Sequence, residues 1–180
     1  MLVEKRYAGE IYDVRDFVRP NSYMVRAVAS TFSTASDRAF AEDAWSYVAN
    51  EIKYPPGPPD IEDTHVEFAY LDPSTGKPLV KRAANDFWSF PEETLATKMG
   101  DCEDKAILLC SLLRTRLPED ECGVVIGRYG LFGHAWVMLS GRWNDLLLET
   151  VLEPGMYVAS QTTRPYHPEF MFNDRYFRRF

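Results

Sequence analysis

The 180-residue sequence lacks the features that mark secreted, zinc-binding and membrane-spanning proteins. Its three cysteines, Cys102, Cys110 and Cys122, are odd in number and show no repeated close spacing, so neither a disulfide framework nor a zinc ribbon is indicated. No stretch approaches the roughly 20 apolar residues that a membrane span needs, and the segment Met1–Tyr7 contains no apolar signal sequence. We therefore expect reduced thiols, no metal or other cofactor, and a soluble cytoplasmic protein without a membrane partner.

Positive charge is also scarce. The chain has 27 acidic and 20 basic residues, which gives a formal net charge of −7. Nucleic acids and anionic membranes need a basic surface, so neither is expected as the main partner, whereas a neutral or cationic substrate is easier to accommodate. With 46% hydrophobic residues and no internal repeat, the chain is long enough for one core, and we predict a single domain over residues 1–180.

Hydrophobic periodicity predicts an α+β fold. Helices are expected over residues 36–53, 91–96 and 102–117, and strands over residues 65–71, 123–129, 134–140 and 143–149. Residues 55–59 and 72–78 are rich in proline and predict a loop and a turn. The helix that begins at Cys102 has a broad apolar surface, which is typical of a central helix packed on a sheet. Cys110 and Cys122 are interpreted as small buried hydrophobic residues.

The last predicted strands bring an imidazole and a carboxylate together. If Gly141 and Arg142 form a two-residue hairpin loop, His134 lies directly opposite Glu149. Directly paired side chains have Cβ atoms about 5 Å apart, so the imidazole can donate to the carboxylate. The same register predicts three apolar side chains on this face, beneath the Cys102 helix: Trp136, Met138 and Leu147.

Cys102, His134 and Glu149 have the chemistry of a nucleophilic triad. A thiol becomes a good nucleophile at neutral pH when a base takes its proton, and the base works best when a third group fixes its tautomer. We assign Cys102 as the nucleophile, His134 as the base and then the acid that protonates the leaving amine, and Glu149 as the group that orients His134. This order predicts a cysteine hydrolase or acyltransferase.

The charges around Cys102 act in opposite directions. A cysteine in the first turn of a helix is favoured as thiolate by the helix dipole and the free backbone N–H groups. Asp101, Glu103 and Asp104 surround the thiol with negative charge, which disfavours a second anion. We expect Asp101 to cap the helix and His134 to supply most of the activation.

An acyl-transfer site also needs donors for the oxyanion. The backbone N–H of Cys102 is one candidate, and such a donor is worth roughly a hundredfold in rate. The indole N–H of Trp88 is a candidate second donor, although an aromatic residue at this place is also consistent with a core position.

Five segments together resemble the core of the transglutaminase-like superfamily of cysteine enzymes, in its single-domain bacterial or archaeal form. The segments are Trp88–Leu95, Gly100–Asp104, Gly133–Val137, Gly141–Trp143 and Leu148–Glu149, within a core of about residues 36–150. The resemblance implies a papain-like fold with a cysteine on a central helix and a histidine and an aspartate on neighbouring strands. Glu149 stands where this family usually has aspartate. Nothing resembles the calcium sites or extra domains of the large animal transglutaminases.

The resemblance leaves three functions open, because family members include transglutaminases, peptidases, amidases and inactive binding proteins. Hydrolysis of a peptide or protein amide is favoured, since a compact single domain shows no second substrate module. Protein-glutamine acyl transfer or deamidation and a catalytically inactive peptide-binding module are the alternatives. The aromatic and arginine-rich segment 166–180 is expected to pack back onto the domain, rather than to line the cleft or contact a partner.

Overall fold

The computed structural model describes residues 1–5, 10–55, 65–71, 78–84 and 88–180. Its helices are α1 (Tyr23–Ala29), α2 (Asp37–Glu51), α3 (Pro91–Thr97) and α4 (Cys102–Arg114), with 3₁₀ turns η1 (Val14–Phe17), η2 (Gly141–Trp143) and η3 (Ala159–Gln161). Its strands are β1 (Leu2–Glu4), β2 (Ile11–Asp13), β3 (His65–Leu71), β4 (Pro78–Ala84), β5 (Cys122–Tyr129), β6 (Phe132–Leu139), β7 (Leu146–Glu149), β8 (Gly155–Val158), β9 (Tyr166–Phe172) and β10 (Phe177–Arg179). In these described ranges, no helix is both long and apolar enough to cross a bilayer.

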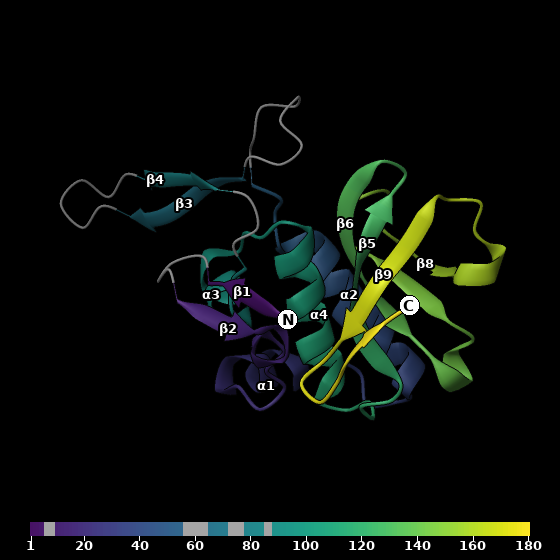
Figure 1. The fold of residues 1–180 in the computed structure, drawn as a ribbon. Coiled ribbons are helices and arrows are strands. Elements are labelled where there is room, and N and C mark those ends of the chain that lie inside the picture. Colours follow the sequence, from purple (N-terminus) through teal and green to yellow (C-terminus); the bar gives the residue numbers. More distant parts are fainter. Residues whose placement is uncertain (6–9, 56–64, 72–77, 85–87) are drawn as a thin grey trace.

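A six-stranded antiparallel sheet forms one side of the molecule, in the order β10-β9-β5-β6-β7-β8. Two further hairpins, β1-β2 and β3-β4, stand apart from it. Figure 1 shows α4 between the large sheet and the elements near the N-terminus. The predicted α+β fold, with the cysteine helix on an antiparallel sheet, is therefore confirmed.

Helix α4 is the centre of the hydrophobic core. The residues Ile107, Leu108, Leu109, Leu112 and Leu113 have no exposed surface. Residues of α1 and α2 pack with α4 and with one face of the sheet in a single cluster. Each fully buried aliphatic side chain contributes roughly 1.5–3 kcal/mol, so the broad apolar surface seen in the sequence holds the helix in place.

Most predicted elements are confirmed. Helix α2 begins after Ser36, whose side chain accepts from the backbone N–H of Ala39 at 3.0 Å, and the predicted strand over residues 65–71 is β3. Residues 56–59 and 72–77, within the predicted loop and turn, lie outside the described residues. The last predicted strand begins later than expected, at Leu146, because Asn144 and Asp145 have positive φ angles of 55° and 50° after η2.

The predicted register between β6 and β7 is wrong by two residues. The connection is not a two-residue loop, and Val137 pairs with Leu148 and Met138 with Leu147. The longer connection through η2 shifts β7 along β6. Because side chains alternate with a period of two, this shift keeps His134 and Glu149 on the same face of the sheet. The two residues are diagonal neighbours rather than direct partners.

The face assigned to α4 is also corrected. Helix α4 packs against the face that carries Ala135, Val137 and Leu148. The opposite face carries a second cluster, with Trp136 and Leu147 at its centre and Met138 packed against it. The expected apolar floor beneath the helix therefore exists, but it is built from the alternate residues of the same strands.

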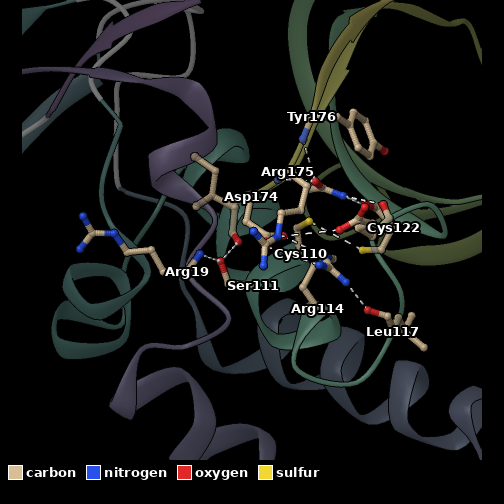
Figure 2. Close-up of polar contacts among 12 residues, drawn as sticks. Arg19, Cys110, Ser111, Arg114, Leu117, Cys122, Asp174, Arg175 and Tyr176 are labelled. Atoms are coloured by element: carbon tan, nitrogen blue, oxygen red, sulfur yellow. Dashed lines mark hydrogen bonds and ion pairs between the residues drawn. The ribbon is translucent and has the colours of Figure 1, made fainter.

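The C-terminal strands extend the large sheet and are tied to α4. Strand β9 pairs with β5 on one side and with β10 on the other. The guanidinium of Arg114 at the end of α4 binds both carboxylate oxygens of Asp174, at 2.8 and 3.4 Å. Figure 2 shows this pair beside the thiols of Cys110 and Cys122, whose sulfur atoms are 3.7 Å apart and fully buried. These contacts fix the end of the chain against the helix.

Candidate active site

Cys102 is the first residue of α4 and lies against strand β6. Asp101 caps the helix, since its side chain accepts from the backbone N–H of Asp104 at 3.2 Å, as predicted. Cys102 is 8% exposed, and the backbone of Ala135 lies near enough to the thiol to lower its pKa. Ala135 follows His134 directly in β6, so the thiol lies one residue along the strand from the predicted base.

The surroundings of Cys102 favour the neutral thiol. Burial raises its pKa well above the ordinary value, and the charges of Glu103 and Asp101 raise the pKa further, while the backbone of Ala135 opposes them. The sulfur atom donates to Oε2 of Glu103 at 2.8 Å. The position at the helix N-terminus alone therefore does not produce a thiolate, as the acidic residues around Cys102 predict.

His134 and Glu149 form a buried pair. Atom Nε2 of His134 lies 2.8 Å from Oε2 of Glu149, and the two residues are 5% and 0% exposed. Three further groups hold the carboxylate: Oε1 accepts from the backbone N–H groups of Val151 at 2.7 Å and Leu152 at 3.0 Å, and Oε2 accepts from the Tyr166 hydroxyl at 2.7 Å. Each carboxylate oxygen thus has two partners.

These contacts keep Glu149 ionised. Burial by itself would raise its pKa, but the hydrogen bond and charge of His134, the Tyr166 hydroxyl and the Val151 N–H outweigh burial, and the pKa is lowered. An ionised carboxylate fixes the orientation of the imidazole and stabilises its protonated form. Because Glu149 engages Nε2, the other nitrogen, Nδ1, is the one that can exchange a proton with a substrate or a thiol. Within the described parts of the chain, no hydrogen bond engages Nδ1.

Aromatic rings enclose the imidazole. The ring of Trp136 stacks on His134 with centroids 6.1 Å apart, and Tyr129 meets His134 edge-on at 6.2 Å. The ring of Tyr166 packs against both neighbours, at 5.0 Å from Trp136 and 5.0 Å from Tyr129. Such walls exclude water and strengthen the polar contacts inside them.

Trp88 lies in the core. Its ring stacks on Phe172 with centroids 5.7 Å apart and an interplanar angle of 12°, and it meets Phe17 edge-on. The indole N–H is buried, and no acceptor among the described residues binds it. No hydrogen bond in the same described set joins it to Cys102. Its assignment as an oxyanion donor stays a prediction.

The predicted site residues are thus brought together in part. His134 and Glu149 are in direct contact on the sheet face that carries Trp136, whereas Cys102 packs on the other face, near the adjacent strand residue Ala135. Among the hydrogen bonds of the described residues, none joins Cys102 to His134. The same residues contain no group of three or more His, Cys, Asp or Glu side chains arranged to hold a metal ion.

Two residues of the site were missed in the sequence. Tyr166 lies in the C-terminal segment, far from any motif, and only the pairing of β9 with β5 brings it to Glu149. Asp104 was considered in the sequence only for its charge, but it is fully buried and its Oδ1 accepts from the backbone N–H of Ser89 at 2.7 Å. An acid in the first turn of a helix is usually exposed, so the sequence gives no signal of this tertiary contact.

No protein-family model matches the sequence, and no curated protein is detectably similar to it. Solved structures of LapG from Legionella pneumophila are similar to this chain. One has a TM-score of 0.59 at 18% identity, over 86% of this chain and 75% of that chain. A calcium-bound LapG structure has a TM-score of 0.47 at 21% identity, over 86% of this chain and 84% of that chain.

We base the comparison on the LapG structure with a TM-score of 0.59. It matches most of both chains, and its likeness concerns the fold, because the sequences have diverged far below the level that shows shared activity. LapG is a bacterial transglutaminase-like cysteine protease. The chain therefore shares the fold of LapG, in agreement with the papain-like fold that the motifs around Cys102 and His134 predict.

Proposed function

We propose that this protein is a cysteine peptidase or amidase that hydrolyses peptide or protein amides through Cys102, His134 and Glu149. The observation that carries the proposal is the buried His134–Glu149 pair, since His134 directly precedes Ala135, the strand residue whose backbone lies near the Cys102 thiol. A fold shared with a cysteine protease supports protein or peptide substrates.

In the proposed reaction, the thiol of Cys102 turns from Glu103 to Nδ1 of His134 and gives up its proton. The sulfur attacks the amide carbonyl carbon, and the resulting oxyanion accepts a hydrogen bond from the backbone N–H of Cys102. His134 then protonates the leaving amine, which breaks the carbon–nitrogen bond and leaves a thioester. Water, deprotonated by His134, attacks the thioester and releases the acid and the thiol. Glu149 stays ionised throughout and holds the imidazole in place.

Peptide cleavage tests this proposal most directly. The purified protein is incubated with a defined mixture of peptides, and the products are identified by mass spectrometry. We expect cleavage by the wild type, none by Cys102→Ala or His134→Ala, and full cleavage by His167→Ala, which removes an exposed histidine of β9 as a matched control. Adding a primary amine separates hydrolysis from acyl transfer, because an amine adduct in place of the acid indicates a transglutaminase.

A second candidate is a peptide-binding protein of the same fold without turnover. The hydrogen bond from the Cys102 thiol to Glu103 favours it, because this contact holds the sulfur as a neutral donor. Binding of the peptide mixture without cleavage, unchanged in Cys102→Ala, would support this candidate and contradict the hydrolase.

A further inference from the structure

Tyr166 is the one side-chain hydroxyl, among the described residues, that binds the Glu149 carboxylate. It donates to the same oxygen, Oε2, that pairs with His134, and the two distances are 2.7 and 2.8 Å. The guanidinium of Arg164 lies near this hydroxyl and lowers the pKa of Tyr166, against the larger effects of burial and of Glu149. A line of hydrogen bonds therefore runs from Tyr166 through Glu149 to the imidazole.

A β-bulge in β9 places the Tyr166 side chain on the sheet face that carries His134 and Glu149. Ile126 pairs with Phe170, but the next residue of β5, Gly127, pairs with Pro168, so β9 contains one extra residue at this point. A one-residue slip moves every following side chain to the other face of the sheet. Without the extra residue, Tyr166 would face α4; with it, Tyr166 joins the cluster of Trp136 on the face of His134.

Gly127 makes this bulge possible. A Cβ atom at this position would lie 2.2 Å from the backbone oxygen of His167 and 2.9 Å from the Cα atom of Pro168. Backbone atoms cannot move aside as the end of a flexible side chain can, so only glycine allows β9 to approach β5 so closely. Gly127 is also the partner of His134 in the neighbouring strand pair. The bulge is thus built next to the imidazole, where bulges commonly redirect a functional side chain.

We propose that Tyr166 is a positioning residue of this site, which holds the Glu149 carboxylate ionised and oriented toward His134. The inference rests on the proposed function for its catalytic meaning, but the contact itself can be tested without turnover. Burial and the contact with Glu149 raise the pKa of Tyr166, so the hydroxyl stays protonated and serves as a donor over the working pH range. The titratable or charged groups around Glu149 and Tyr166 include His134, Arg164, the packed ring of Tyr129, and Lys105, which acts on Glu149 through its charge.

The test uses Tyr166→Phe, which keeps the aromatic ring and removes only the hydroxyl. The matched control is Tyr157→Phe, whose hydroxyl lies on the same face of the sheet but donates to the backbone oxygen of Glu153. Two NMR signals are followed: the imidazole N–H resonance of His134 and the titration of the Glu149 side-chain carboxyl carbon. In Tyr166→Phe we expect the N–H resonance to broaden or shift and the Glu149 midpoint to rise by roughly one pH unit. Both signals should be unchanged in Tyr157→Phe.

Unchanged signals in Tyr166→Phe would overturn the inference, as would equal changes in both variants. The rate of Cys102 alkylation distinguishes this failure from a failure of the proposed function. If the wild-type thiol has the reactivity of an ordinary buried thiol, the proposed function is wrong, and the NMR comparison still decides the role of Tyr166. If the protein cleaves peptides, we expect Tyr166→Phe to lower kcat roughly tenfold with KM unchanged, whereas a purely structural role would lower the melting temperature instead.

Discussion

Atom Nε2 of His134 lies 2.8 Å from Oε2 of Glu149, although the two residues are not opposite each other in the sheet. In the observed register Glu149 is displaced by two residues, and diagonal neighbours in a sheet are about 7–8 Å apart rather than about 5 Å. The longer glutamate side chain spans this distance. The family that this sequence resembles usually has aspartate at this position. The glutamate at position 149 is longer, and this length suits the diagonal arrangement of the two strand residues.

Shortening this side chain should break the pair. In Glu149→Asp the carboxylate is withdrawn by about one carbon–carbon bond, so it can no longer hold both His134 and the backbone N–H groups of Val151 and Leu152. We expect kcat for peptide cleavage to fall about tenfold to hundredfold, the effect of a 1 Å misplacement in other sites. Steady-state kinetics of Glu149→Asp and Glu149→Gln measure this. Equal activity in Glu149→Asp and the wild type would show that the diagonal geometry is not important.

Glu103 should restrain the Cys102 thiol. Its carboxylate accepts from the sulfur and raises the pKa of the thiol, after the larger effect of burial. In Glu103→Gln the charge is removed, and we expect the thiolate fraction and the alkylation rate at neutral pH to rise about tenfold. Asp120→Asn, which removes an exposed acid elsewhere, is the control. A slower reaction in Glu103→Gln would mean that this carboxylate activates the thiol rather than restrains it.

Lys105 gives a separate test of how the helix is buried. Burial, with a smaller effect from Lys53, lowers the pKa of Lys105 from 10.5 to about 8, and its Nζ donates to the backbone oxygen of Ile52. Between these two values the unfolded chain binds a proton that the folded protein has lost, so the free energy of unfolding rises with pH. The gain is at most about 3 kcal/mol.

Urea unfolding of the wild type and Lys105→Met, at pH values from 7 to 10.5, measures this gain. The difference in free energy of unfolding between the two proteins should increase with pH in favour of the wild type. Tyrosines and cysteines also titrate in this range, and comparing the two proteins cancels their effect. A constant difference would show that Lys105 keeps its ordinary pKa in the folded protein.

The fold could be predicted from the sequence because its main elements have clear local signals. The apolar surface of the segment 102–117 and the cap at Asp101 predict α4, and short alternating runs predict β5 and β6. Strands β8, β9 and β10 were not predicted, because most of their residues are partly or fully exposed and their order in the sheet depends on pairing with distant parts of the chain.

Only the site residues that lie in sequence motifs could be predicted. The contact between His134 and Glu149 was predicted from a hairpin loop that is shorter than the observed connection. The contact still forms, because a shift of two residues leaves both side chains on the same face of the sheet. Tyr166 could not be predicted, since its position depends on a one-residue bulge opposite Gly127. The single-domain organisation and the cytoplasmic location stay predictions.

The pH dependence of iodoacetamide alkylation at Cys102, in the wild type and in His134→Ala, tests the central claim most directly. Peptide mass locates the label, and Cys110 and Cys122 serve as internal controls, because both are fully buried and should react only after unfolding. Although its surroundings raise the pKa of Cys102, we predict that proton transfer to His134 supplies the thiolate, so that Cys102 is labelled at neutral pH far faster than the two control cysteines and loses this reactivity in His134→Ala. Slow labelling with an ordinary thiol profile, unchanged by the substitution, would contradict the cysteine peptidase.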